Sequence, residues 1–397
     1  MPSRHRTVVV GASTGGFTTA ESLRCNGYDG RITVVGEEPH RPYHRPPLSK
    51  QILAGEWALG DATITSAATT PALSIDLVLG TRATGLDTDR RTVKTTDGEL
   101  SFDSLVIATG VSARRPARQY ALAGFHTLRT LDDSTALTAD LRGATHVLVV
   151  GAGVLGSEIA AVLAKRGLAV TLVGRSGSIR FGQTGSLLSS RVADLHETNG
   201  VRLLLALDVI RLLGTDRVTG AVLSDGSTVA ADVVVAAVGS SPRVEWLAGS
   251  DLQLADGVVC DSAGRAAKDI YAVGDVARWS DTPGTHSARV EHQQNAIEQA
   301  HAVASTISTG IPHAPDIVPF FWSELYGTRI QAYGRFTGAG TLDVVAGDPA
   351  EGKFVGLASR DGTAVGVVGW NLPRAFRIAR AQFTSGTADI GERQLAP

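Results

Sequence analysis

Two short glycine-rich segments have the residue types and spacing that hold a phosphate group. The first, residues 11–16, reads Gly-Ala-Ser-Thr-Gly-Gly, and the second, residues 151–156, reads Gly-Ala-Gly-Val-Leu-Gly. In such a segment the first glycine permits a tight turn, and the last lets a helix pack close to a strand. The N–H groups and partial positive charge at the start of that helix favour a pyrophosphate. The two segments therefore predict two dinucleotide sites.

Each segment stands between a predicted strand and a predicted helix, and a second strand follows. The expected order is strand 7–10, helix 17–25 and strand 31–35, then strand 146–150, helix 157–166 and strand 169–173. This is the opening of a Rossmann unit, so the sequence predicts an α/β fold with two Rossmann-like domains.

The residues after each second strand differ in charge. Glu37 stands where a carboxylate accepts hydrogen bonds from an adenosine ribose, although Ser13 replaces the middle glycine of this unit. In the second unit Arg175 and Ser176 take the place of the carboxylate, and with Arg180 they suit a ribose 2′-phosphate. This pattern favours NADPH. The alternative is that Arg175 is a solvated arginine and that NADH binds without a ribose carboxylate.

Further along the chain, predicted strands again end on glycine, where backbone passes near a bound nucleotide. Residues 105–110 and 233–239 are of this kind. In residues 269–276, Asp275 directly follows a strand and Gly274, a spacing that suits a hydrogen bond from a ribityl hydroxyl. The alternative is that Asp275 caps the next helix.

Composition excludes several other classes of protein. The formal net charge of −2 gives no reason to expect a nucleic acid or an anionic membrane as partner. Apolar stretches are of strand length, and no signal segment begins the sequence, so we expect a cytoplasmic location. Cys25 and Cys260 are far apart, which excludes a disulfide framework and a local dithiol, and both are expected to be buried. No metal-ligand cluster or Ser-His-Asp order is visible.

Taken together, the motifs resemble one family. Residues 11–16, 108–110, 151–156 and 273–275 occur in the order seen in flavoproteins with two dinucleotide domains, which are related to disulfide reductases. Further segments resemble the ferredoxin reductase branch that serves bacterial monooxygenases and dioxygenases: residues 43–50, 128–131, Glu291 with residues 294–296, and residues 321–323. Disulfide reductases keep cysteine beside the flavin, whereas residues 46–50 here read Pro-Pro-Leu-Ser-Lys. The resemblance therefore implies that electrons pass straight from flavin to an acceptor.

The resemblance also implies site residues. Those for FAD are Gly11, Ser13, Gly15, Gly16, Glu37, Arg45, Lys50, Ala83, Ala108, Thr109, Gly110, Arg129, Gly274, Asp275, Glu291 and Trp322. Those for the nicotinamide nucleotide are Gly151, Gly153, Leu155, Gly156, Glu158, Arg175 and Gly239. Lys50 and Glu158 are the expected catalytic residues, at the flavin edge and the nicotinamide end. The alternatives are a surface lysine and a carboxylate placed by the helix dipole. Gln293 stands where relatives often have tryptophan, which leaves the preferred electron acceptor open.

The resemblance divides the chain into three domains. We expect an FAD domain at 1–113 and 244–316, an NAD(P)H domain at 114–243, and a small C-terminal α+β interface domain at 317–397. The implied activity is transfer of electrons from NAD(P)H through FAD to a transiently bound iron–sulfur ferredoxin that supplies an oxygenase such as a cytochrome P450. The alternatives are an oxidase or dehydrogenase using oxygen, quinone or another small acceptor, and a nucleotide-responsive interaction module. The oligomeric state is left as monomer or homodimer. Three arginines on a predicted helix at 373–384 suit an acidic ferredoxin, or else form a solvated face: Arg374, Arg377 and Arg380.

Overall fold

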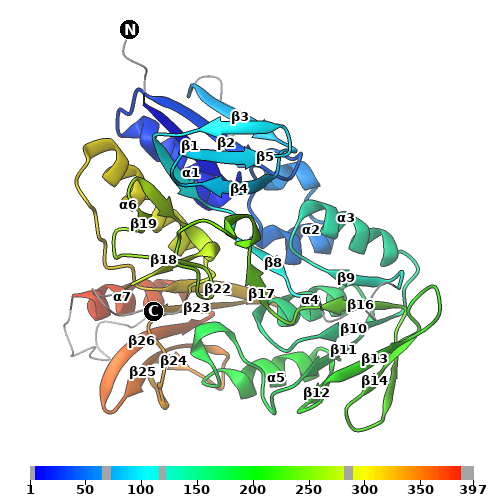
Figure 1. Cartoon of the computed structure of the whole chain (residues 1–397). Helices are drawn as coiled ribbons and strands as arrows, with labels where there is room; N and C mark the ends of the chain where they lie inside the picture. Colours follow the sequence, from blue (N-terminus) through cyan, green and yellow to red (C-terminus); the bar gives the residue numbers. More distant parts are fainter. Residues whose placement is uncertain (1–4, 65–72, 116–121, 281–288, 386–397) are drawn as a thin grey trace. The chain divides into compact units, whose positions relative to one another are not determined.

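The computed structural model describes residues 5–64, 73–115, 122–280 and 289–385, and its element labels are those of Figure 1. Contacts divide the chain into two compact units. The first is drawn from residues 1–44, 60–112 and 240–319, and the second from residues 45–59, 113–239 and 320–397. The division into three domains stays a prediction.

The first unit is built on a six-stranded sheet in the order β19-β20-β7-β1-β2-β3. Its parallel core has nearly continuous buried runs such as residues 8–10, as expected for a sheet covered on both faces. The chain order reverses between β1 and β7, which makes this the switch point of the sheet, where ligands bind outside the carboxyl ends of the strands. The strands are β1 (Arg6–Val10), β2 (Arg31–Gly36), β3 (Ile75–Leu79), β7 (Ser104–Ile107), β19 (Arg265–Ala267) and β20 (Ile270–Ala272).

Two helices of this unit, α1 (Thr14–Cys25) and α6 (Gln293–Thr309), pack against each other. A separate antiparallel sheet contains β4 (Ala83–Asp87), β5 (Thr92–Thr95) and β6 (Gly98–Ser101). The remaining elements are η2 (Leu59–Ala62), β8 (Val111–Ala113), β17 (Ser240–Pro242), η5 (Glu245–Leu247), β18 (Val258–Cys260), η6 (Gly274–Val276) and β21 (Ala277–Trp279).

The second unit repeats the arrangement with a five-stranded parallel sheet in the order β12-β11-β10-β16-β9. The strands are β9 (Phe125–Thr127), β10 (His146–Val150), β11 (Ala169–Gly174), β12 (Arg202–Leu205) and β16 (Val233–Ala236). The helices are η1 (Pro46–Ser49), α2 (Gln51–Ala54), α3 (Leu131–Asp140), α4 (Val154–Lys165), η4 (Gly182–Thr184) and α5 (Ser189–Thr198). A small antiparallel sheet holds β13 (Val209–Leu213), β14 (Gly220–Leu223) and β15 (Thr228–Ala230).

The end of the chain adds an antiparallel sheet to this second unit, with α7 (Pro373–Thr384) packed against it. The sheet order is β22-β23-β26-β25-β24. Three of its strands lie where the sequence predicts them, β24 (Thr341–Asp348), β25 (Lys353–Arg360) and β26 (Thr363–Trp370). The sequence did not predict the other two, β22 (Phe320–Leu325) and β23 (Thr328–Gly334).

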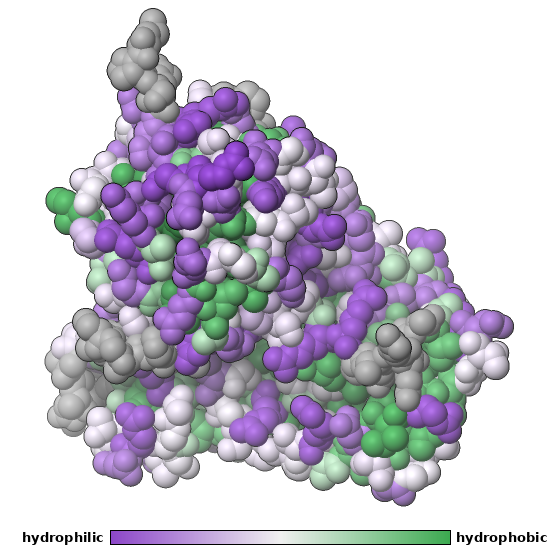
Figure 2. Space-filling model, viewed as in Figure 1, coloured by the Kyte–Doolittle hydropathy of each residue, from purple (hydrophilic) through white to green (hydrophobic). Residues whose placement is uncertain are grey.

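The surface corrects one expectation of the sequence. Cys260 is buried as predicted, but Cys25 is exposed, because it is the last residue of α1 and lies beyond the packed face of that helix. The face shown in Figure 2 is largely polar, with apolar residues in patches. In the part of the chain that the structure describes, no helix has the length and apolar character needed to cross a membrane.

Candidate functional site

The first glycine-rich turn lies between β1 and α1, at the switch point of the sheet in the first unit. Gly11 has φ +122°, and a Cβ there would lie 2.1 Å from the carbonyl oxygen of Ala108. A Cβ on Gly16 would lie 1.9 Å from the carbonyl oxygen of Gly11. Both positions therefore require glycine. Ser13 is the N-cap of α1, and its side chain makes no capping hydrogen bond. The first turn of α1 thus keeps N–H groups for a ligand oxygen, which fits a pyrophosphate.

The residue predicted to bind the ribose is part of an ion pair that the sequence did not reveal. The guanidinium of Arg243 lies 2.5 Å from Oε2 of Glu37. The main-chain N–H of Arg243 donates to the carbonyl of Gly110, and its own carbonyl accepts from the hydroxyl of Thr109 at 2.8 Å. Three predicted FAD contacts therefore share one arginine.

A second arginine joins two more of the predicted contacts of this unit, Asp275 and Glu291. Arg289, with a side chain only 7% exposed, donates to the carbonyl of Asp275 and to Glu291, at 2.7 Å and 2.8 Å. It also pairs with Asp256, at 3.4 Å. Glu291 accepts a further hydrogen bond of 2.6 Å from the hydroxyl of Ser240. Arg289 thus joins η6, which contains Asp275, to Glu291.

Helix α6 closes the site from the side of the glycine-rich turn. The Cβ of Ala296 lies 3.7 Å from the position that a Cβ on Gly15 would take, and 3.4 Å from the same position on Gly274. At the start of the helix, Nε2 of Gln293 lies 2.8 Å from Nδ1 of His44. Burial lowers the pKa of His44, which favours the neutral imidazole. Nδ1 of that neutral ring accepts a hydrogen bond from the amide of Gln293. Ala83, another predicted FAD contact, is the first residue of β4 in the separate antiparallel sheet.

The second glycine-rich turn lies between β10 and α4 in the second unit and has the same geometry. Gly151 has φ +115°, and a Cβ there would lie 2.2 Å from the carbonyl oxygen of Ala237. A Cβ on Gly156 would lie 1.8 Å from the carbonyl oxygen of Gly151. Gly153, the N-cap of α4, has open space around its Cβ position, with the nearest atom 3.9 Å away. The space beside Gly153 is therefore left for a ligand.

Two arginines flank this second turn. Arg175 follows β11 directly, and the main-chain N–H of Arg180 donates to the carbonyl of Ala152 inside the turn. Both side chains are exposed, and no carboxylate in the described part of the chain pairs with either. Leu155 lies in the first turn of α4, and Gly239, with φ +96°, accepts a hydrogen bond from the N–H of Arg114.

The two predicted catalytic residues, Lys50 and Glu158, form a buried ion pair in the second unit. Nζ of Lys50 lies 2.7 Å from Oε2 of Glu158. The hydroxyls of Ser49 and Ser323 each donate to this carboxylate at 2.6 Å. The ammonium also lies 5.1 Å from the centre of the Trp322 ring, a cation–π contact. Lys50 is therefore no surface lysine.

The two remaining predicted FAD residues also meet in the second unit. Nη1 of Arg45 donates to the carbonyl of Arg129 at 2.6 Å. The N–H of Arg129 donates to Asp133, which also forms the capping box of α3 with Thr130. This network fixes the backbone of Arg129.

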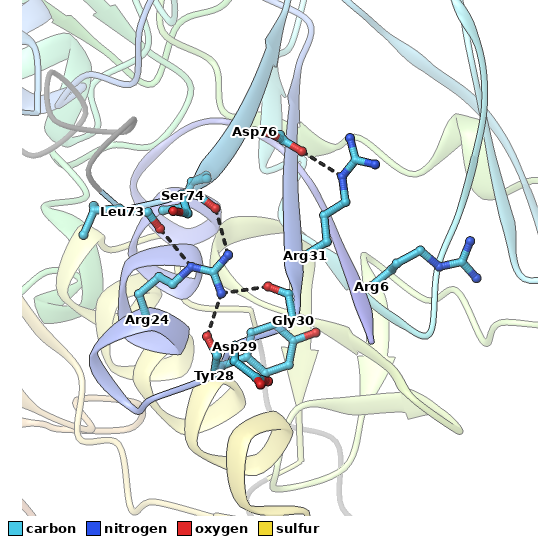
Figure 3. Close-up of a pocket in the computed structure, with 10 residues that line it drawn as sticks. Arg6, Arg24, Tyr28, Asp29, Gly30, Arg31, Leu73, Ser74 and Asp76 are labelled. Carbon is cyan, nitrogen blue, oxygen red and sulfur yellow. Dashed lines mark hydrogen bonds and ion pairs between the residues drawn. The ribbon is translucent and has the colours of Figure 1, made fainter. Parts of the chain in front are cut away.

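A pocket in the first unit is lined by three arginines, which bond to neighbouring parts of the fold and are not assigned to a ligand (Figure 3). It lies where β1, β2 and β3 begin, whereas the glycine-rich turn follows the end of β1. Arg24 donates to the carbonyls of Tyr28, Gly30, Leu73 and Ser74, and so joins α1 to the start of β3. Arg6 and Arg31 pair with aspartates through their Nε atoms. The cations of this pocket hold the fold together.

Sequence reasoning missed Arg243, Arg289, Ser49 and Ser323 as residues of these sites. Arg243, Ser49 and Ser323 contact partners that are distant in sequence. Arg289 contacts the nearby Glu291 but also Asp275 and Asp256, and it belongs to none of the motifs. Ser49 and Ser323 had one signal, their places in the segments 43–50 and 321–323 that supported the family resemblance. Among the described residues, no group of three or more histidines, cysteines and carboxylates is arranged to hold a metal ion.

Two family models match the chain. Residues 5–300 match the pyridine nucleotide-disulphide oxidoreductase family, and residues 320–396 match the reductase C-terminal family. The matched ranges together span both glycine-rich turns and the C-terminal sheet.

Individual proteins match over nearly the whole chain. A ferredoxin–NAD(P)+ reductase of a Sphingomonas species is 37% identical over 364 residues, which is 90% of this chain and 87% of the relative. The ferredoxin reductase component of chlorobenzene dioxygenase from Cupriavidus sp. (strain PS12) is 35% identical over 397 residues, 98% of this chain and 94% of the relative. Among solved structures, the ferredoxin reductase for the CYP199A2 system from Rhodopseudomonas palustris is 32% identical, with a TM-score of 0.89, covering 94% of this chain and 93% of that one.

Proposed function

The chain belongs to the pyridine nucleotide-disulphide oxidoreductase family, and from this premise we propose that it is an FAD-dependent ferredoxin–NAD(P)+ reductase. The buried pair of Lys50 and Glu158 carries this proposal. Lys50 belongs to residues 46–50, the segment where the resemblance places the cysteine of disulfide reductases, and this segment contains no thiol. The ferredoxin reductases named among the chain's relatives support the same activity.

FAD and a pyridine nucleotide are the cofactors of this family, and the two glycine-rich turns fit them. FAD, when bound, accepts a hydride from the reduced nicotinamide and passes electrons on singly. The chain's own residues bind the two cofactors and orient them. We assign the first turn to the FAD pyrophosphate and the second to the nicotinamide nucleotide. Glu158 and Lys50 supply a fixed pair of charges, which Ser49 and Ser323 hold in place by hydrogen bonds.

NADPH is the proposed reductant. Support comes from Arg175 and Arg180, two exposed guanidiniums without a described carboxylate partner at the second turn. A guanidinium binds a 2′-phosphate through two parallel hydrogen bonds. In the first unit the corresponding position after the strand holds Glu37, which would repel such a phosphate. The two units therefore differ in the charge that they offer to a ribose.

The proposed electron acceptor is an acidic iron–sulfur ferredoxin, bound transiently. Arg374 and Arg377 on α7 are exposed and offer it positive charge. Arg380, predicted from the sequence to share this role, instead lies over the rings of Tyr333 and Phe320, at 4.2 Å and 5.2 Å from their centres. We limit the proposed docking surface to Arg374 and Arg377. A cytoplasmic location and a monomeric or homodimeric state remain part of the proposal.

Anaerobic reduction by NADPH and NADH in parallel tests the reductant. The full chain is purified, its flavin spectrum is confirmed, and bleaching is fitted for a rate and an apparent dissociation constant. NADPH is expected to bind more tightly and to bleach the flavin at lower concentration. Preference for NADH would overturn the role of Arg175 and leave the reductase assignment standing. Failure of both nucleotides to bleach the flavin would overturn the proposed function itself.

A second measurement separates a ferredoxin reductase from an oxidase. Turnover is compared with an iron–sulfur ferredoxin coupled to cytochrome c and with oxygen or a quinone as direct acceptor. Ferredoxin-dependent turnover well above the direct rate is expected. Rapid turnover with small acceptors and none through any ferredoxin would favour the oxidase or dehydrogenase.

A further inference from the structure

Arg243 joins two strand ends on either side of the first glycine-rich turn. Its main chain is bonded to Thr109 and Gly110, just beyond the end of β7. Its guanidinium pairs with Glu37, the first residue after β2. In the sheet, β7 and β2 are the two neighbours of β1, which leads into the turn. Arg243 thus lies at the carboxyl edge where a dinucleotide binds in such a sheet.

We propose that Arg243 is a positioning residue for Glu37, and that through this carboxylate it determines how tightly the adenosine half of FAD is held. The inference rests on the proposed function, because it takes FAD as the ligand of the first turn. It adds a residue that no motif contains.

The ion pair is too exposed to serve mainly as a stabiliser of the fold. The side chains of Arg243 and Glu37 are 39% and 37% exposed. Ion pairs with this exposure contribute about 0–1 kcal/mol to folding. The pair does, however, hold Oε2 of the carboxylate beside the guanidinium of Arg243, a residue whose backbone is fixed by two hydrogen bonds. With Oε2 bonded to Arg243, Oε1 of Glu37 remains to accept from a ribose hydroxyl.

The second unit repeats this backbone arrangement with the opposite charge at the strand end. There the N–H of Arg114 donates to the carbonyl of Gly239, as the N–H of Arg243 donates to Gly110 in the first unit. The residue that follows β11 is Arg175, where Glu37 follows β2 in the first unit. An arginine at this backbone position is thus common to both units, and in the first unit it meets a carboxylate. The ribose-binding role therefore belongs to the Glu37–Arg243 pair.

The experiment compares the release of two flavins from the full-length holoprotein. One is FAD and the other is its analogue that lacks the adenosine 2′-hydroxyl, introduced by exchange against excess analogue. Release is followed by the rise in flavin fluorescence on dilution. The variants are Arg243→Met, Arg243→Lys, Glu37→Gln and the double variant of Arg243→Met with Glu37→Gln. The matched control is Arg31→Met, which removes an exposed ion pair with Asp76 at the other end of the same strand.

Arg243→Met is expected to release FAD about tenfold faster, the loss of one charge-assisted hydrogen bond. Arg243→Lys restores part of the retention, Arg31→Met matches the unchanged protein, and the double variant is no worse than Glu37→Gln. With the 2′-deoxy analogue, the effect of Arg243→Met should largely vanish. Thermal unfolding measured beside each release rate separates lost folding from lost positioning.

Two results would overturn the inference and leave the reductase intact. One is release of FAD from Arg243→Met at the unchanged rate. The other is an equal increase in the release rates of FAD and the 2′-deoxy analogue, which would mean that Arg243 stabilises the site without acting on the ribose 2′-hydroxyl. An unchanged protein that retains no FAD would instead overturn the proposed function together with the inference.

Discussion

The ammonium of Lys50 and the carboxylate of Glu158 lie 2.7 Å apart, with side chains only 8% and 6% exposed. Three elements of the second unit meet at this pair. Lys50 follows η1, Glu158 lies on α4, and Ser323 on β22 donates to the carboxylate. Since a buried charge is stable only when it is paired and hydrogen-bonded, the pair joins these elements as well as placing charge.

Removing one partner of this pair is expected to destabilise the protein strongly. Lys50→Met leaves the carboxylate of Glu158 buried with only two serine hydroxyls, which costs about 3–5 kcal/mol. Urea unfolding, followed in the double variant of Lys50→Met with Glu158→Gln as well, checks this. The double variant should recover part of the loss, because it removes the unpaired charge. Equal stability of Lys50→Met and the unchanged protein would contradict the buried pair.

Two glycines of the second turn should respond differently to the same substitution. A Cβ on Gly156 would lie 1.8 Å from the carbonyl of Gly151, so Gly156→Ala must move α4 and is expected to cost at least about 2 kcal/mol. Gly153→Ala meets its nearest atom at 3.9 Å and should cost about 1 kcal/mol or less. Its defect should appear in nucleotide affinity, because the methyl group enters the open space at the helix start. Thermal unfolding and nucleotide titration of both variants check the contrast.

The sequence predicted the repeated parts of this fold because they depend on local pattern. The predicted strand 146–150 and helix 373–384 coincide with β10 and α7. Helix α1 begins at Thr14, earlier than predicted, because the glycine-rich turn itself supplies its first residues. The pairs of Arg243 with Glu37 and of Lys50 with Glu158 join residues far apart in the chain, so no spacing could reveal them.

His196 should make stability depend on pH. Its side chain is fully buried, Nδ1 lies 2.9 Å from the hydroxyl of Tyr326, and Nε2 has no partner among the described residues. Burial lowers its pKa from 6.5 to about 4. Between these pH values the imidazole of His196 binds a proton in the unfolded chain but not in the folded one. The contribution of neutral His196 to the free energy of unfolding is therefore fully present above pH 6.5 and is lost as the pH drops towards 4.

The loss due to His196 is on the order of 3 kcal/mol over this range. Urea unfolding at pH values from 7.5 down to 4.5 checks it against His196→Gln, which keeps a hydrogen-bonding group but does not titrate. The difference between the two curves isolates His196 from the other histidines. Parallel curves would contradict the prediction.

Arg175→Ala should change the choice of nicotinamide nucleotide. Loss of a guanidinium that pairs with a 2′-phosphate is expected to weaken NADPH binding about tenfold or more. NADH binding should change little, because NADH lacks that phosphate. Arg202→Ala is the control, since Arg202 is also exposed but begins β12, at the amino end of the same sheet. If both variants weaken NADPH binding equally, the effect comes from the loss of positive charge in general and not from a contact between Arg175 and the 2′-phosphate.

Charge reversal on α7 should weaken the use of ferredoxin and spare the chemistry that precedes it. Arg374→Glu combined with Arg377→Glu replaces exposed positive charge by negative charge, so an acidic ferredoxin is expected to associate about tenfold more slowly at low salt. The difference should shrink as salt screens the charges. Reduction of the flavin by NADPH should stay unchanged. The measurement is the KM for ferredoxin at two ionic strengths, with an uncharged quinone as acceptor for the control. If the KM for ferredoxin at low salt is the same in the double variant, the charges of Arg374 and Arg377 do not take part in docking. The ferredoxin then binds another surface of the protein.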